Sequence, residues 1–226
     1  MQRRDFNLNT LTASLSAMAL PAWAQAQAPA AKPVAGPPLK LSEGKDYNRL
    51  EHPQASDAGA GKIELIEFFW YSCPHCNAFE PTFANWVKNA PKDVVVRRIP
   101  VAFNDSFAPQ QRLFFTLEAL NLLDTLHVKV FQAVHVDKQP LNTDASIQAW
   151  AEKQGVDKTK FADTYKSFAM VSKLRRAVQL QNDFKVEGVP SLGIAGRFYT
   201  DGSMAGSMER ALQVTEALLA QVRQGK

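Results

Sequence analysis

The sequence predicts an α/β protein, and three patterns along the chain support this class. The run from Lys62 to Trp70 is apolar almost without interruption, which is typical of a strand buried on both faces of a sheet. Apolar residues at spacings of three and four follow it and indicate a helix, after which a second strand pattern appears. The C-terminal part contains a hairpin pattern and a final amphipathic helix. With 226 residues, of which 46% are hydrophobic, the chain is long enough to bury a substantial core.

The first residues have the pattern of an export signal. Arg3 and Arg4 form a basic start, Leu11 to Leu20 is weakly apolar, and Ala22-Trp23-Ala24 is a cleavage signal. We therefore expect residues 1–24 to be a signal peptide, and the paired arginines also resemble a twin-arginine signal. Residues 25–38 are rich in Ala and Pro and predict a disordered linker. No later run approaches the roughly 20 apolar residues of a membrane-spanning helix, so we expect a soluble mature protein.

Residues 39–104 are predicted to form the first part of the sheet domain. The strand at Lys62 to Trp70 leads into a helix that begins at Pro74, where Phe79 and Phe83 mark the buried face. A second strand is predicted from Lys92 to Ile99. These elements form a strand, helix, strand unit, as in parallel sheets.

Residues 105–170 contain no strand pattern and predict an inserted helical domain. Amphipathic helices are expected around Leu113 to Leu120 and from Val128 to His135. Thr143 or Asp144 can cap a third helix, and Asp157 can cap a fourth.

Residues 171–226 are predicted to complete the sheet domain. A long helical pattern from Phe168 to Phe184 leads to Gly188-Val189-Pro190. A hairpin follows, with strands at Ser191 to Ile194 and Arg197 to Thr200 around a tight Ala195-Gly196 turn, and then a helix opened by Ser207. This order of elements is that of a thioredoxin fold with an inserted all-helical domain.

The charge of the chain argues against nucleic acid as a partner. Its 26 basic and 22 acidic residues give a formal net charge of +4, which is too small to indicate a nucleic-acid-binding surface. A short basic group at Lys173, Arg175 and Arg176 is typical of a solvated helix face.

Cys73 and Cys76 are the only two cysteines in the chain. A disulfide between residues this close restrains little of the unfolded chain, so a purely structural bridge is a weak explanation of the pair. A structural zinc site needs four ligands, and His52, His127 and His135 lack the spacing of a zinc finger relative to the pair. After export, a lone Cys-x-x-Cys pair favours redox chemistry, with no metal.

Three features of the pair are expected to lower the pKa of Cys73. The residue lies at the start of a helix, where free backbone N–H groups and the helix dipole favour an anion. Pro74 suits the first helical position, and His75 can donate a hydrogen bond or carry a positive charge. A stabilised thiolate favours the reduced form, so the pair should act as an oxidant. Cys76 should be the buried second thiol.

The sequence Cys73-Pro74-His75-Cys76 after a Glu-Phe-Phe strand, the Gly188-Val189-Pro190 element and the helical insertion resemble the DsbA family, the periplasmic thiol:disulfide oxidoreductases of Gram-negative bacteria. The likeness runs from about Leu39 to the C-terminus. It implies a thioredoxin fold with a helical insertion and the donation of a disulfide to newly exported proteins. Cys73 would form the mixed disulfide with the substrate.

The resemblance also implies roles for other residues. Pro190 matches the family's cis-proline, and the backbone of Val189 would pair with an extended substrate segment. On its residues alone, Glu67 is open to two interpretations, an exposed Glu at a strand edge or a costly buried carboxylate. The family has a buried acid at this spacing that assists proton transfer to the second cysteine. Arg98 stands where the family commonly has Lys, and as a permanent cation it can pair with Glu67 but not transfer protons. We expect Tyr71 to line the substrate surface.

We therefore expect a periplasmic protein disulfide oxidoreductase that needs no cofactor beyond its own disulfide. Its partners would be reduced exported proteins and a DsbB-like, quinone-linked oxidase of the inner membrane, and the protein itself would be a monomer. One alternative is a periplasmic disulfide isomerase or reductase. Known isomerases of this kind carry an N-terminal dimerisation domain, for which residues 25 to 60 are too short. Another alternative is a peptide- or metal-binding thioredoxin-like module.

Overall fold

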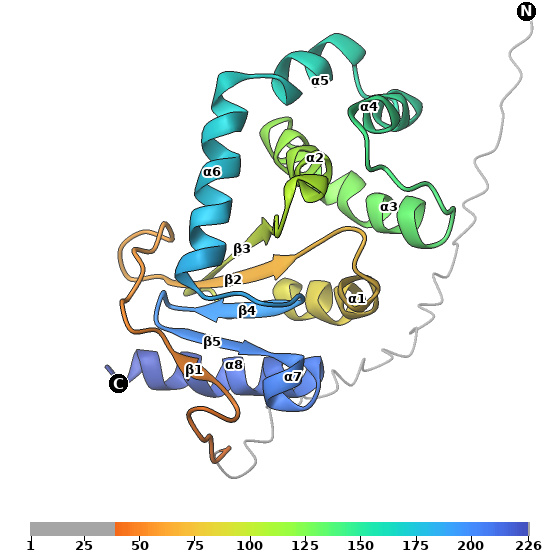
Figure 1. Ribbon diagram of the computed structural model, residues 1–226. Helices are drawn as coiled ribbons and strands as arrows, with labels where there is room; N and C mark the ends of the chain where they lie inside the picture. Colours follow the sequence, from red (N-terminus) through yellow and green to blue (C-terminus); the bar gives the residue numbers. More distant parts are fainter. Residues whose placement is uncertain (1–38, 226) are drawn as a thin grey trace, which may run out of the picture. The chain divides into compact units, whose positions relative to one another are not determined.

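A computed structural model describes residues 39–225 (Figure 1). The expected signal peptide at 1–24 and the expected linker at 25–38 lie outside these residues, so both remain predictions from the sequence.

One five-stranded mixed sheet forms the centre of the fold, with the strand order β1-β5-β4-β2-β3. The central strand β2 runs parallel to β3 and antiparallel to β4, and β5 pairs antiparallel with both β4 and β1. Their bounds are Asn48–Arg49 for β1, Ile63–Phe69 for β2, Val94–Pro100 for β3, Ser191–Ile194 for β4 and Phe198–Asp201 for β5. The sequence did not predict β1, because two residues carry no pattern and their strand conformation comes from pairing with β5.

Helices cover both faces of the sheet. Their bounds are Pro74–Lys88 for α1, Ala108–Ala119 for α2, Leu123–His135 for α3, Asp144–Lys153 for α4, Lys158–Tyr165 for α5, Phe168–Asp183 for α6, Gly202–Ala205 for α7 and Met208–Arg223 for α8, with a 3-10 turn at Asp105–Phe107 before α2. Figure 1 shows α1 and α8 along one side of the sheet, while α6 rises from the other side to α2–α5.

Residues of β2 enter two different hydrophobic clusters. Leu65 packs with side chains of α1 and α8, whereas Ile66 and Phe68 pack with those of α2 to α6. This strand is therefore buried on both faces, as predicted. The thioredoxin fold with a helical insertion predicted from the order of elements is confirmed.

Local sequence signals set most helix boundaries correctly. Thr143, Asp157 and Ser207 cap α4, α5 and α8, and each side-chain oxygen accepts a backbone N–H from the first turn of its helix. The start of α3 at Leu123 lies earlier than the predicted Val128, which is 59% exposed. The buried stripe of α3 consists instead of Leu126, His127, Val130 and Phe131 with Ala133.

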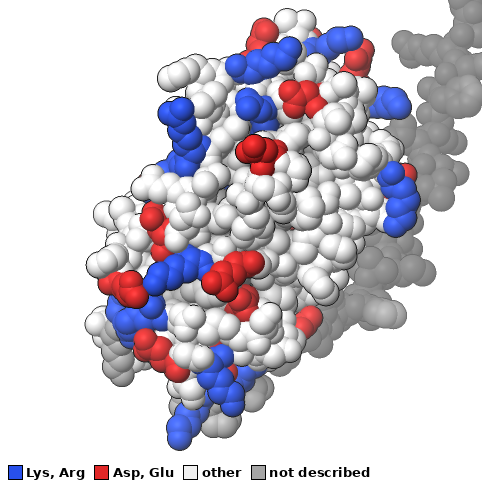
Figure 2. Space-filling model, viewed as in Figure 1, with Lys and Arg blue, Asp and Glu red and all other residues white. Residues whose placement is uncertain are grey.

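Charged residues of both signs are interspersed over the face shown in Figure 2. A broad area without charge lies to the right, the side on which β2 leads into α1 in Figure 1. Within residues 39–225, no helix is long and apolar enough to cross a membrane.

Candidate redox site

The two cysteines lie where β2 turns into α1. Cys73 is the N-cap residue of α1, with extended backbone dihedrals, and Pro74 occupies the start of the helix. The Cys73 sulfur takes the place of a capping oxygen and accepts the backbone N–H of Cys76 at 3.3 Å. Cys73 is 7% exposed and Cys76 only 1%, and both are free thiols in the described structure. The local sequence thus places one reachable sulfur and one buried sulfur in a single helical turn.

The loop before β4 forms the opposite wall of the site. The Val189–Pro190 peptide bond is cis, as the resemblance implied, and the Cys73 thiol donates to the Val189 carbonyl oxygen at 3.3 Å. A groove of about 430 Å³ opens beside this contact, and its lining includes His75, Val189, Pro190 and Met208. The fold therefore brings Cys73 and His75 together with the predicted Val189 and Pro190, and adds Met208, which the sequence did not predict.

The surroundings of Cys73 lower its pKa to about 6. The largest cause is its hydrogen bond with the side chain of Cys76, and the backbone N–H groups of Cys76 and His75 act in the same direction against the effect of burial. The charge of His75 makes the smallest named contribution. The hydrogen bonds from the Cys76 thiol and from the backbone amides thus lower the Cys73 pKa more than the charge of His75 does.

Cys76 has the opposite character. Burial raises its pKa well above the ordinary value for a thiol, and its contact with Cys73 and the negative charge of Glu67 raise it further. The thiolate form of Cys76 is therefore strongly disfavoured. The two sulfurs are chemically unequal although they lie in one turn of helix.

Glu67 is 2% exposed, which decides between the two interpretations of the sequence in favour of a buried acid. It faces Arg98 in the register of β2 and β3, and the Arg98 Nε donates to Glu67 Oε2 at 2.9 Å. Burial raises the pKa of Glu67 to about 8, with the positive charge of Arg98 opposing and the negative charge of Glu80 adding to the increase. Glu67 is therefore placed to hold a proton near neutral pH.

Glu80 is a second buried carboxylate that reasoning from the sequence missed. It is 4% exposed on α1, and its Oε1 accepts the Arg98 Nη2 at 2.8 Å. Arg98 thus bridges Glu67 and Glu80, with its guanidinium carbon 5.3 Å from the centre of the Phe83 ring. The spacing could have revealed Glu80, because it follows Cys76 by one turn of the same helix and so shares its buried face.

The inserted helices hold the loop between β2 and Cys73. Tyr71 is fully buried, and its hydroxyl lies 2.8 Å from His127 Nδ1 on α3. The Tyr71 carbonyl oxygen lies 2.7 Å from His135 Nε2, and the amide of Gln110 on α2 makes two hydrogen bonds with Ser72. This corrects the expectation for Tyr71, since a fully buried side chain does not line a substrate surface. Tyr71 instead anchors the cysteine loop to the insertion.

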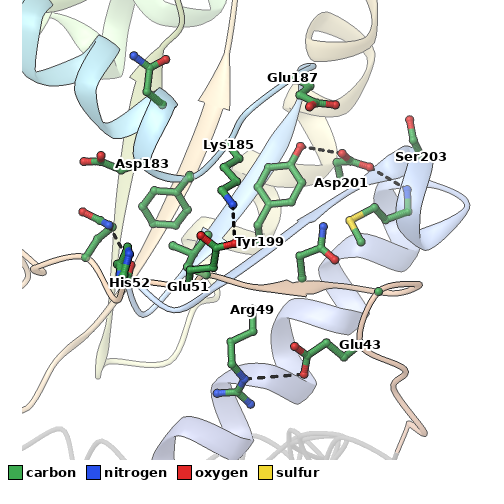
Figure 3. Close-up of a pocket in the computed structure, with 17 residues that line it drawn as sticks. Glu43, Arg49, Glu51, His52, Asp183, Lys185, Glu187, Tyr199, Asp201 and Ser203 are labelled. Carbon is green, nitrogen blue, oxygen red and sulfur yellow. Dashed lines mark hydrogen bonds and ion pairs between the residues drawn. The ribbon is translucent and has the colours of Figure 1, made fainter.

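A larger cavity of about 840 Å³ lies away from the cysteines, between β1, β5 and the end of α6 (Figure 3). Salt bridges cross it, from Lys185 to Glu51 at 3.1 Å and from Arg49 to Glu43 at 3.8 Å. Several charged residues of the lining are therefore paired with one another. The groove that adjoins Cys73 is the smaller one, lined by His75, Val189 and Pro190. Within the described residues, no three His, Cys, Asp or Glu side chains are grouped to hold a metal ion.

The sequence matches a known family and curated proteins over most of its length. Residues 98–213 match the family described as "DSBA-like thioredoxin domain". The chain is 38% identical over 189 residues to the thiol:disulfide interchange protein DsbA of Burkholderia cepacia, an alignment that covers 84% of this chain and 89% of the relative. It is 39% identical over 188 residues to the protein of the same name in Bordetella pertussis, covering 83% of this chain and 89% of that one.

Solved structures agree with these matches. The crystal structure of Pseudomonas aeruginosa DsbA superimposes with a TM-score of 0.78 at 35% identity, covering 82% of this chain and 96% of that one. Because the identity exceeds a third over most of both chains, and the fold and the thiol pair agree, the protein belongs to the DsbA family of thiol:disulfide oxidoreductases.

Proposed function

We propose that the protein oxidises pairs of thiols in newly exported proteins by donating a Cys73–Cys76 disulfide. The inequality of the two thiols carries this proposal. Cys73, with its pKa lowered to about 6, is a good leaving group near neutral pH, whereas burial makes the Cys76 thiolate unfavourable. Because the reduced pair is stabilised, its disulfide is readily reduced and can be transferred to a substrate.

In the first step a substrate thiolate attacks the sulfur of Cys73 in the oxidised protein. A bond forms between the substrate sulfur and Cys73, and the Cys73–Cys76 bond breaks, so that Cys76 leaves with the electron pair. Cys73 is the accessible member of the pair, beside the groove that contains Val189 and Pro190. The product is a mixed disulfide between substrate and enzyme.

The leaving Cys76 thiolate then needs a proton, and Glu67 is the proposed donor. The acid is buried close enough to Cys76 for its charge, when ionised, to raise the Cys76 pKa, and its own pKa of about 8 keeps it mostly protonated near neutral pH. Arg98 cannot supply this proton, because a guanidinium does not lose its own. Its proposed role is to pair with the carboxylate that remains.

In the second step the other substrate thiolate attacks the substrate sulfur of the mixed disulfide. The bond to Cys73 breaks, and Cys73 leaves as the thiolate that the start of α1 stabilises. Two substrate thiols have become one disulfide, and the enzyme has gained the two electrons as a reduced pair of cysteines.

We propose that substrates bind in the groove between α1 and the loop that precedes β4. The Val189 carbonyl oxygen already contacts the Cys73 thiol, so the backbone here lies at the reacting sulfur. An extended segment pairing with Val189 and passing Pro190 would place a substrate cysteine next to Cys73. His75 lines the same groove from the α1 side.

The remaining assignments follow from the leader sequence and the family. We propose a periplasmic location after cleavage near residue 24, with reduced exported proteins as substrates. Reoxidation requires an external acceptor for two electrons, and we propose a DsbB-like, quinone-linked membrane protein. The redox-active disulfide is the proposed cofactor, and the proposed state is a monomer.

The test is transfer of the disulfide to a peptide with two free thiols, followed by mass spectrometry. The oxidised protein should convert the peptide to its disulfide and become reduced in equal amounts. Cys76→Ser should accumulate a mixed disulfide at Cys73, and Cys73→Ser should form none. If the protein instead rearranged mispaired disulfides while leaving the dithiol peptide reduced, it would be an isomerase rather than an oxidase.

A further inference from the structure

The buried cluster beneath the cysteines contains more negative than positive groups. Glu67 and Glu80 share one guanidinium, with Arg98 Nε bound to Glu67 at 2.9 Å and Arg98 Nη2 bound to Glu80 at 2.8 Å. When two carboxyl groups share one buried site, ionising both is costly, and one of them tends to hold a proton. The position of that proton matters, because the charge of Glu67 acts on Cys76.

His127 on α3 touches this cluster at one end only. Its Nε2 lies 3.5 Å from Glu80 Oε2, and within the described structure neither atom has another hydrogen-bond partner. Both residues are almost fully buried, at 4% exposure. Two buried polar atoms that face each other and nothing else point to an interaction between them.

The other ring nitrogen of His127 fixes which atom carries the hydrogen. Nδ1 lies 2.8 Å from the Tyr71 hydroxyl, which can donate to it. A carboxylate can only accept, so the nitrogen that faces Glu80 must be the N–H. A neutral imidazole with its hydrogen on Nε2 satisfies both partners at once.

The packing around His127 holds the ring in this orientation. Phe69 of β2, Phe114 of α2 and Phe131 of α3 meet it edge to face, with ring centres 5.3 to 5.9 Å apart. The charged and titratable groups that act on it are Glu80 of α1, Arg98 of β3 and the Tyr71 hydroxyl. Burial lowers the pKa of His127, which favours the neutral ring.

We propose that His127 is a positioning residue that keeps the shared proton of the cluster on Glu67 by donating a hydrogen bond to Glu80. Glu80 then has two donors, Arg98 and His127, whereas among residues 39–225 Arg98 is the one side-chain donor to Glu67. Because hydrogen bonds favour the ionised form of a carboxyl, the proton belongs on Glu67, next to the second cysteine. This inference rests on the proposed proton transfer from Glu67 to Cys76.

Two substitutions separate the two contacts of His127. His127→Asn retains an acceptor near the position of Nδ1 for Tyr71 but removes the donor to Glu80. His127→Gln places an amide donor near the position of Nε2 and removes the acceptor. His135→Gln is the matched control, since His135 lies on the same helix, contacts the backbone of Tyr71 and forms no ion pair with a carboxylate in the described part of the chain.

The main measurement is the titration of Glu67 by carbon-13 NMR of its side-chain carboxyl, assigned with Glu67→Gln. In His127→Asn we expect the midpoint to fall by about one pH unit, because one charge-assisted hydrogen bond has been lost from Glu80. His127→Gln and His135→Gln should stay close to wild type. In parallel, the rate of peptide oxidation by His127→Asn should begin to fall at a lower pH than in wild type.

An unchanged Glu67 midpoint in His127→Asn would overturn the inference. A second check uses Glu80→Gln, which should lower the Glu67 midpoint by itself and leave His127→Asn with no further effect. If His127→Asn shifted the Glu67 midpoint as much in the Glu80→Gln background as in wild type, the inference would also be overturned. If the His127→Asn single variant folds poorly, the shift is measured in the Glu80→Gln background, where it should be absent. The NMR midpoint of Glu67 does not depend on activity. If wild-type protein fails to oxidise the peptide, the proposed function is refuted, but the role of His127 in placing the proton is still decided by the NMR titration.

Discussion

The low pKa of Cys73 has a thermodynamic consequence that can be measured without any substrate. The perturbation is pH, applied to the reduced and the oxidised protein. Only the reduced form has free thiols, and because Cys76 stays protonated in the folded protein below pH 8, the pH dependence of the difference in unfolding free energy comes almost entirely from Cys73. The loop restraint of the disulfide is independent of pH and cancels from the slope.

The magnitude follows from the two pKa values of the thiol. A pKa of about 6 in the folded protein lies below the value of about 8.5 in an unfolded chain. Thiolate stabilisation is therefore fully present above pH 8.5 and is lost as the pH falls through 6. At 1.36 kcal/mol per unit, the calculated gain from pH 5 to pH 8 is about 2.5 kcal/mol. Solvent screening at the groove reduces this, so we expect roughly 1 to 2.5 kcal/mol.

The assay is urea unfolding of both forms at several pH values, with Cys73→Ser as the control for titration of other groups. The reduced form should gain stability relative to the oxidised form as the pH rises from 5 to 8. The control contains no Cys73 thiol, so its curve gives the pH dependence of the other groups, and it should lack the gain in stability that reduced wild type shows between pH 5 and pH 8. A difference between reduced and oxidised wild type that stays constant over this range would refute the assignment of a low Cys73 pKa.

Three further predictions concern single residues. His75→Ala should raise the midpoint of the Cys73 thiolate titration, followed by ultraviolet absorbance, by less than about one unit, because the His75 charge contributes least to the lowered Cys73 pKa; a larger rise would show that His75 is a major cause of the low pKa. Glu67→Gln should gain stability over wild type as the pH rises from 5 to 8, by roughly 3 to 4 kcal/mol, because a raised folded pKa makes the Glu67 protein lose stability as the pH rises through it; urea unfolding that shows no such trend would contradict the buried proton. Gly193→Ala should lower the free energy of unfolding by roughly 1 to 3 kcal/mol, because the added Cβ would lie 2.4 Å from the Phe184 ring. If the variant had the same thermal unfolding midpoint as wild type, the Phe184 ring would have moved aside without cost.

Much of the fold was predictable because its signals are local. The apolar run of β2, the helix that starts after Cys73 and the capping residues Thr143 and Ser207 each act within a few positions of the chain. The hairpin turn at Ala195 and Gly196 also appeared as predicted, with φ of 55° and 63° at the two positions.

The cysteine pair belongs to the same local category. The spacing of Cys73 and Cys76, together with Pro74 at the helix start, determines that one sulfur caps the helix while the other turns inward. The redox chemistry of the pair could therefore be predicted from the short stretch between Glu67 and Cys76.

The tertiary structure decided the environment of that pair. Whether Glu67 is buried depends on the strands and helices packed around it. For the same reason Tyr71, which we expected at the substrate surface, lies in the interior. Glu80 and His127 carry no local pattern that links them, and they meet only because α3 of the insertion packs against α1. The sequence by itself determined which sulfur caps the helix, since capping is a property of one helical turn. The burial and the charge partners of Glu67 were decided by the fold, since both depend on segments far apart in the chain.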